Sequence, residues 1–118
     1  MDIASIKNLA YEIMGDKEEI PHGVGYRLFH GYRVGAIAEK LAIKLGEPTD
    51  LLFIAGILHD IGKDKAGHPE DDGVMHGPRG GEIVRNRFVH YMSVDELHRI
   101  IAMVQNHNAR PKSKWIVD

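Results

Sequence analysis

The side chains best suited to chemistry are His59 and Asp60, which stand next to each other near the end of an apolar run. Both residue types are strong metal ligands. Neighbouring residues on a helix point about 100° apart, so this pair can converge on one ion only where the helix ends or widens, and Gly62 is predicted to end it. Three further imidazoles are expected to gather around the pair as a metal centre: His30, His76 and His107.

Composition limits the remaining chemistry. The chain has 118 residues, eight histidines and no cysteine, which excludes disulfides, thiolate catalysis and Cys-ligated zinc. A formal net charge of −2 gives no strong nucleic-acid signal and no general attraction to membranes, so affinity for phosphate is expected from a local site. No secretory pattern or long apolar run stands out, and we expect a cytoplasmic protein with no membrane contact.

Apolar side chains recur at three- and four-residue spacing, which predicts helices over residues 3–14, 28–45 and 51–58. The last of these is apolar almost all round and is expected to be the most buried, with Thr49 as its N-cap. Gly46 is suited to cap the end of the second helix. That second helix carries an apolar stripe expected to be its buried face, made of Val34, Ile37, Ala38, Leu41, Ala42 and Leu45.

The second half of the chain is predicted to hold a loop and two more helices. Residues 63–75 contain glycines, prolines and charges, and we expect an exposed loop there. Pro78 suits the first turn of a helix that continues over 80–90. Ser93 and Glu96 form a capping box that opens the last helix. No segment alternates long enough to be a strand, so the prediction is an all-α, single compact bundle of about five helices.

The four candidate histidine segments carry distinct motifs. His30 stands in His-Gly-Tyr-Arg-Val, and the doublet His59 and Asp60 stands in Leu-His-Asp-Ile-Gly-Lys. His76 follows in Met-His-Gly-Pro-Arg-Gly-Gly-Glu-Ile, and His107 in Val-Gln-Asn-His-Asn. Together these motifs resemble the HD-domain superfamily of metal-dependent phosphohydrolases. The resemblance implies one HD-type domain over 1–118. In it, residues 1–25 form an N-terminal helix and loop, and residues 28–118 form the core that carries the motifs.

The resemblance also implies how metal would be held. His30, His59 and Asp60 are assigned to one ion, and His76 and His107 to a second, with Asp60 bridging the two. Family members with a single metal do not need the later pair of histidines, so one ion or two remain open. A distal Asp is usual in the family, and Asp118 is either that ligand or the ligand is missing from this sequence. Iron or manganese is the metal that the resemblance favours, and the mixed ligand shell also suits zinc, nickel or cobalt.

The function implied is hydrolysis of a phosphate monoester or anhydride, with a small phosphorylated, nucleotide-like substrate. Such a reaction needs an activated water and compensation of charge on the phosphoryl oxygens. Asp60 and three cations near the ligands, Arg33, Lys63 and Arg79, are the candidate catalytic residues. The three cations could equally be solvated surface charges.

Two narrower or different functions fit the same residues. One is a hydrolase of symmetric dinucleoside polyphosphates, or a phosphodiesterase, which a filled second metal position would favour. The other is a regulatory domain that binds metal or nucleotide without turnover, which an absent distal Asp would favour. A homodimer is possible because Trp115 and Ile116 form an apolar tail.

Overall fold

The structure is a computed structural model, and it describes residues 1–15, 18–19, 23–63 and 69–107. It confirms the all-α class. The helices are α1 (Ile3–Met14), α2 (Tyr26–Leu45), α3 (Thr49–Leu58), α4 (Pro69–Arg87) and α5 (Val94–Asn106), with a 3-10 turn, η1, at Val89–Tyr91. Two short strands, β1 (Glu18–Glu19) and β2 (Gly23–Val24), pair antiparallel before α2. The sequence pattern did not indicate this two-residue ladder.

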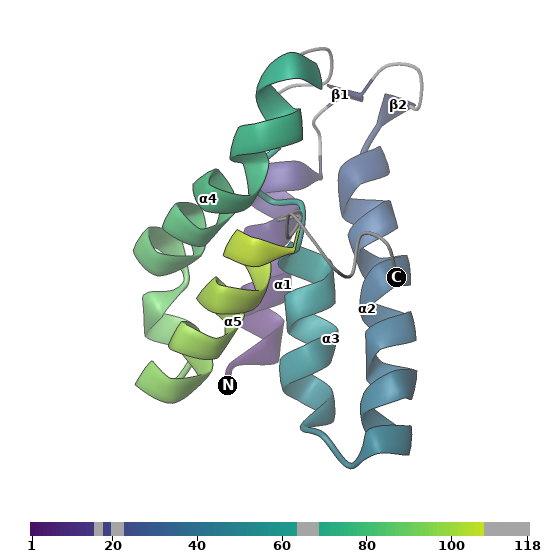
Figure 1. Ribbon diagram of the computed structural model, residues 1–118, viewed down its shortest axis with the longest axis vertical. Coiled ribbons are helices and arrows are strands. Elements are labelled where there is room, and N and C mark those ends of the chain that lie inside the picture. The colour runs from purple at the N-terminus through teal and green to yellow at the C-terminus, as the bar shows by residue number, and fades with distance from the viewer. Residues whose placement is uncertain (16–17, 20–22, 64–68, 108–118) are drawn as a thin grey trace, which may run out of the picture.

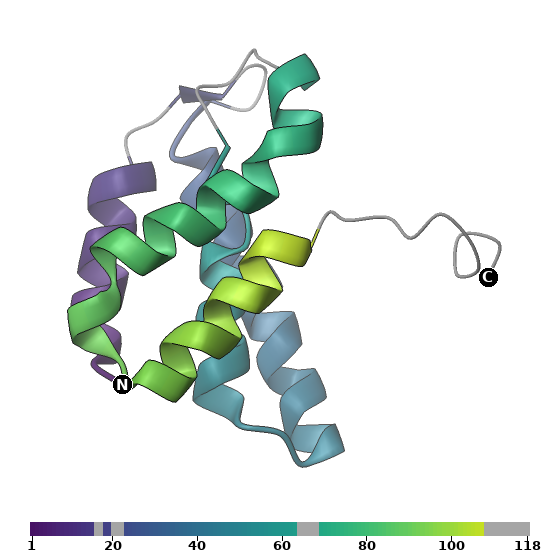
Figure 2. The ribbon, with the colours of Figure 1, turned by 60° about the vertical axis from the view of Figure 1, so that its left-hand side comes forward.

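Helix α3 lies in the middle of the bundle. In Figure 1 it stands between α2 and α5, with α1 behind it and α4 on the far side of α5. Figure 2 shows α4 starting near the strands and running down the bundle, with α5 packed beside its lower part. The end of α3 therefore faces three other helices, and any side chain placed there can meet partners from all of them.

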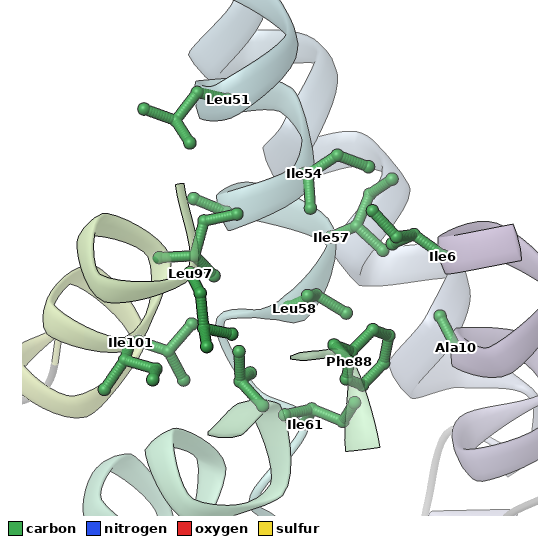
Figure 3. Close-up of a cluster of buried hydrophobic side chains, with 14 of the residues drawn as sticks. Ile6, Ala10, Leu51, Ile54, Ile57, Leu58, Ile61, Phe88, Leu97 and Ile101 are labelled. Carbon is green, nitrogen blue, oxygen red and sulfur yellow. The ribbon is translucent and has the colours of Figure 1, made fainter. Parts of the chain in front are cut away.

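The core forms around α3, as its nearly continuous apolar sequence predicts. Six of its residues are buried, and Ile54 and Leu58 are fully so. Figure 3 shows side chains from α1, α3 and α5 converging on Phe88, which follows α4 and is itself completely buried. Filling this volume with large apolar groups stabilises the fold by about 1.5–3 kcal/mol for each fully buried side chain.

The predicted buried stripe of α2 is largely wrong. Ile37 and Leu41 are 61% and 52% exposed, and of the six stripe residues only Ala42 is buried. The face that meets α3 instead carries Gly31 and Gly35. A Cβ on Gly31 would lie 2.5 Å from the Ile57 carbonyl oxygen, so α2 and α3 pack backbone against backbone. Periodicity of apolar residues misses such a contact because glycine adds no hydrophobic signal.

The predicted loop over residues 63–75 is also partly wrong, because α4 already begins at Pro69. A proline followed by Glu70, Asp71 and Asp72 is typical of a helix start, where a missing N–H costs nothing and acidic residues favour the helix dipole. Pro78 is therefore inside α4 rather than in its first turn. The helix ends at Arg87, and the 3-10 turn η1 occupies the last residues of the predicted 80–90 helix.

Several helix ends are as predicted. Gly46 ends α2 in the left-handed conformation with φ 74°. Ser93 and Glu96 form both hydrogen bonds of the capping box at the start of α5, at 3.1 and 2.9 Å. The start of α3 differs, because Pro48 is its N-cap and Thr49 is already helical. No helix among residues 1–15, 26–58 and 69–107 is long and apolar enough to cross a membrane.

Candidate metal centre

The His59–Asp60 pair lies where α3 gives way to tighter turns. His59 caps the helix, and its N–H points to the Gly56 carbonyl, three residues back. The N–H of Ile61 likewise bonds to the Leu58 carbonyl at 3.0 Å. These three-residue steps replace the four-residue steps of the helix and change the angle between successive side chains. As a result His59 Nε2 comes within 3.1 Å of Asp60 Oδ2, and the predicted convergence of two adjacent side chains is found.

Gly62 has another role than the predicted one. Its φ is not positive, so it does not end the helix as a left-handed cap. Instead, a Cβ at this position would collide with the His76 carbonyl oxygen and with the Gly80 backbone of α4. The absence of a side chain on Gly62 lets α4 approach the turn that carries Asp60. The same contact brings the His76 side chain within reach of that carboxylate.

A matching glycine contact places His30. Gly31, the next residue on α2, lies directly against the Ile57 backbone of α3. His30 therefore reaches His59, and the centroids of their rings are 5.3 Å apart. Both approaches, of α2 and of α4, depend on glycine backbone in contact with the segment around the His59–Asp60 pair.

The Asp60 carboxylate is shared between two pairs of histidines. Its Oδ2 atom lies 3.1 Å from His59 Nε2 and 3.9 Å from His30 Nε2, and we call this group the Oδ2 half-site. Its Oδ1 atom lies 3.3 Å from His76 Nε2 and 3.0 Å from His107 Nε2, the Oδ1 half-site. Within each half-site the candidate ligand atoms all lie within 4.8 Å of one another. The structure thus brings together all five of these residues in the grouping that the resemblance implied.

The donor atoms fit a divalent cation. His59 Nδ1 and His107 Nδ1 each lie 2.7 Å from a backbone carbonyl, of Gly56 and Val104 respectively. A carbonyl only accepts, so each Nδ1 carries a proton, and Nε2 can present its lone pair to the cluster once it carries none. Lone pairs this close to an ionised carboxylate repel one another unless a proton or cation lies between them. Imidazole nitrogen with carboxylate oxygen is a donor set typical of divalent transition metals.

The charge state of the cluster follows from its contacts. Burial would raise the pKa of Asp60, but hydrogen bonds from His107 and His59, with the charges of His59 and Arg27, hold that pKa well below its usual range. For His107, burial lowers the pKa, and the hydrogen bonds to Asp60 and to Val104 outweigh it, so the net pKa is raised. Burial, together with neighbouring His59, lowers the pKa of His30. The centre is therefore an ionised carboxylate among imidazoles of unequal basicity.

The three predicted cations lie around this centre in different settings. Arg79 donates from Nε to the Gly62 carbonyl at 2.8 Å, so part of its guanidinium supports the turn after Asp60. Arg33 is exposed, with its guanidinium carbon 5.1 Å from the Phe29 ring centroid. Lys63 is half-buried, and its charge is the smallest of the influences on the His107 pKa. Asp118, the predicted distal ligand, lies outside the described residues, as do Trp115 and Ile116.

Sequence reasoning missed Arg27. This residue is only 7% exposed, and its Nη1 donates to Asp60 Oδ2 at 2.9 Å. It also missed Tyr26, whose ring stacks on His30 with 5.8 Å between centroids. A signal for Arg27 was present, because it continues the four-residue spacing of Gly31 and Gly35 on the α2 face that meets α3.

Comparison with known proteins agrees with this geometry. The family model described as "HD domain" matches residues 27–115, which include all five residues of the cluster. No curated protein and no solved structure matches the chain. The match covers most of the chain, and the folded structure brings the histidines and the Asp60 carboxylate of the matched segment together at the end of α3. On these grounds the chain belongs to the HD-domain family.

Proposed function

We propose that this protein is a metal-dependent phosphohydrolase that acts on a phosphate monoester or anhydride of a nucleotide-like substrate. The observation that carries the proposal is the division of the Asp60 carboxylate between two histidine pairs. One oxygen faces His30 and His59, and the other faces His76 and His107. Membership of the HD-domain family supports the reaction class, and the resemblance alone supports a nucleotide-like substrate.

The residues that would hold metal are His30, His59 and Asp60 in one half-site, and Asp60, His76 and His107 in the other. Divalent ions bound there would lower the pKa of water and offset charge on the phosphoryl oxygens. Neutral imidazoles leave the charge of a cation uncancelled, so such a site stays attractive to an anion. Among the described residues, Asp60 is the only carboxylate in the two half-sites, and its contacts with His107, His59 and Arg27 lower its pKa and keep it ionised.

The candidate substrate contacts are the predicted cations. Arg33 lies one helical turn after His30. Lys63 follows Asp60 by one tight turn, in which the Lys63 N–H donates to the Asp60 carbonyl at 3.0 Å. We assign both to contacts with phosphate oxygens, which a guanidinium or an ammonium binds through charge-assisted hydrogen bonds. Arg79 is assigned mainly to the Gly62 turn that it already supports.

The test combines metal content with phosphate release. Protein purified without added metal is analysed for its elements per mole of chain. It is then assayed with Mn²⁺ or Fe²⁺ on nucleoside monophosphates, nucleoside triphosphates, dinucleoside polyphosphates and cyclic dinucleotides. We expect bound transition metal and turnover of at least one class, both lost in Asp60→Ala. The matched control is Glu82→Ala, which removes an exposed carboxylate on α4 and is expected to change neither.

The outcomes separate the alternatives. Turnover of dinucleoside polyphosphates or of diesters alone would narrow the function to that class. Metal binding without turnover on any class, together with tight nucleotide binding, would replace the hydrolase with a regulatory binding domain. Equal metal content in Asp60→Ala and in the unaltered protein would contradict the proposed centre itself.

A further inference from the structure

Within residues 1–63 and 69–107, as far as the structure describes them, the two half-sites offer the same ligand types, two imidazoles and one carboxylate oxygen each. A difference in their affinity for a cation must therefore come from their geometry and from the charges around them. Both of these differ in the structure. These differences decide which half of the centre takes an ion first, given the metal centre proposed above.

Geometry is the first difference. The atoms of the Oδ1 half-site form a closed triangle, with His76 Nε2 and His107 Nε2 2.9 Å apart and Asp60 Oδ1 at 3.3 and 3.0 Å from them. Around one ion with bonds of about 2.0–2.2 Å, neighbouring ligand atoms lie roughly 2.9–3.6 Å apart. The Oδ1 half-site already matches this spacing. The Oδ2 half-site is more open, because His30 Nε2 is 3.9 Å from Asp60 Oδ2.

Charge is the second difference. The buried guanidinium of Arg27 contacts Asp60 on Oδ2, the oxygen that the more open half-site uses. The Tyr26 ring lies beside this group, with its centroid 5.5 Å from the guanidinium carbon. A fixed positive charge next to Oδ2 repels a second cation at that position, and burial weakens the screening by water.

We propose that Arg27 is a positioning residue that makes the two half-sites unequal, so that the first divalent ion binds between Asp60 Oδ1, His76 and His107. In the protein without metal, Arg27 acts as the counter-ion of the buried carboxylate. With one ion bound at the Oδ1 half-site, the carboxylate has a metal on one oxygen and a guanidinium on the other. The Oδ2 half-site then fills only at higher metal concentration, against the charge of Arg27.

The experiment is a titration of chelator-treated protein with Co²⁺ alone, followed by calorimetry. His30→Ala disables the Oδ2 half-site, and His76→Ala disables the Oδ1 half-site. We expect the Kd of the first ion to change little in His30→Ala and to rise about tenfold or more in His76→Ala. A rise in His30→Ala as large as that in His76→Ala would overturn the inference.

A second set of variants tests the role of the Arg27 charge. In the His76→Ala background, Arg27→Met should strengthen Co²⁺ binding at the Oδ2 half-site by about tenfold, because the repelling charge is gone. Arg27→Lys, the matched control, keeps the charge and should give no such recovery. Arg27→Gln serves as a second neutral variant if Arg27→Met does not fold. Equal recovery in the neutral and the Lys variants would overturn the assigned role.

These outcomes are distinct from those of the proposed function. If the Kd of the first Co²⁺ ion rises only in His76→Ala and no substrate is hydrolysed, this inference is supported and the proposed hydrolase function is overturned. Hydrolysis with no difference between His30→Ala and His76→Ala overturns this inference and leaves the hydrolase standing. Absence of Co²⁺ binding by the unaltered protein overturns both.

Discussion

Asp60 Oδ1 and His107 Nε2 face each other across 3.0 Å although 47 positions separate them in the chain. His107 donates from Nδ1 to the Val104 carbonyl, so its Nε2 meets the carboxylate either as a second N–H or as a lone pair. In the absence of metal a proton fills this contact, in keeping with the raised pKa of His107. Asp60 is therefore the residue at the end of α3 that side chains from α2, α4 and the end of α5 all contact.

Replacing Asp60 by Asn should separate its role as a metal ligand from its role as the hydrogen-bond partner of Arg27. The amide oxygen should turn toward Arg27, which can only donate, and the NH₂ group should then face His76 and His107. We expect loss of metal at the Oδ1 half-site and a loss of about 1–3 kcal/mol in the unfolding free energy of the metal-free protein. Metal analysis and urea unfolding with a chelator measure these effects. Glu82→Gln is the control, and unchanged metal content in Asp60→Asn would contradict the prediction.

Substituting Gly31 should damage the fold and the metal centre together. The Cβ of an alanine would lie 2.5 Å from the Ile57 carbonyl oxygen, so α2 must move away from α3 and carry His30 with it. We expect Gly31→Ala to lower the unfolding free energy by about 2 kcal/mol. Gly81→Ala is the matched control, because its nearest contact is the Gln105 Cβ atom at 3.2 Å, a far smaller overlap with no backbone atom involved. Equal stability of the two variants in thermal unfolding would show that the close approach is dispensable.

Metal should stabilise the folded chain strongly. The candidate ligands come from α2, the end of α3, α4 and the end of α5, so they are assembled only in the folded state. A ligand that binds only that state, at roughly one hundred times its Kd, adds about 2.7 kcal/mol to the unfolding free energy. Differential scanning calorimetry with and without Mn²⁺ measures the gain. A midpoint that stays the same when a chelator is added would mean that these four segments do not share an ion.

The α5 capping box should make stability depend on acid pH. The hydrogen bond from the Ser93 backbone N–H lowers the pKa of Glu96 below its ordinary value of 4.5. A lowered folded-state pKa means that the contribution is fully present above the unfolded-state value and is lost as pH falls through the folded-state value. Glu96→Gln should therefore cost about 0.5 kcal/mol at pH 7 and progressively less as the pH falls through the lowered folded-state pKa. Urea unfolding across this range tests it, and a difference that does not change with pH would contradict the role of the charge.

The residues of the candidate site were easier to predict than the surroundings that position them. The motifs around His59, Asp60 and three distant histidines, through their resemblance to a known family, allowed these residues to be grouped before the structure was seen. Their convergence depends on Gly31 and Gly62, whose contribution is the absence of a side chain. Patterns of apolar or charged residues carry no trace of such contacts, so the reason for the convergence became visible only in three dimensions.

Arg27 and Arg33 illustrate the same limit. Both lie one turn from His30 on α2, and their spacing from His30 gives no reason to prefer either. Only the four-residue spacing with Gly31 and Gly35 singles out Arg27. Arg33, a candidate catalytic residue from the sequence, is exposed, whereas Arg27 is the residue buried against Asp60. The choice depends on which face of α2 meets α3, and the misleading apolar stripe of Ile37 and Leu41 pointed to the wrong face.

The aromatic rings at the centre form an unbroken series. Successive centroids from Tyr26 through His30, His59 and His107 to His76 are 5.8, 5.3, 5.2 and 4.7 Å apart. Each ring lies in the magnetic field induced by the circulating electrons of the next, so their proton resonances are shifted together. The imidazole region of a nuclear magnetic resonance spectrum therefore records, in one set of signals, whether four helices have docked.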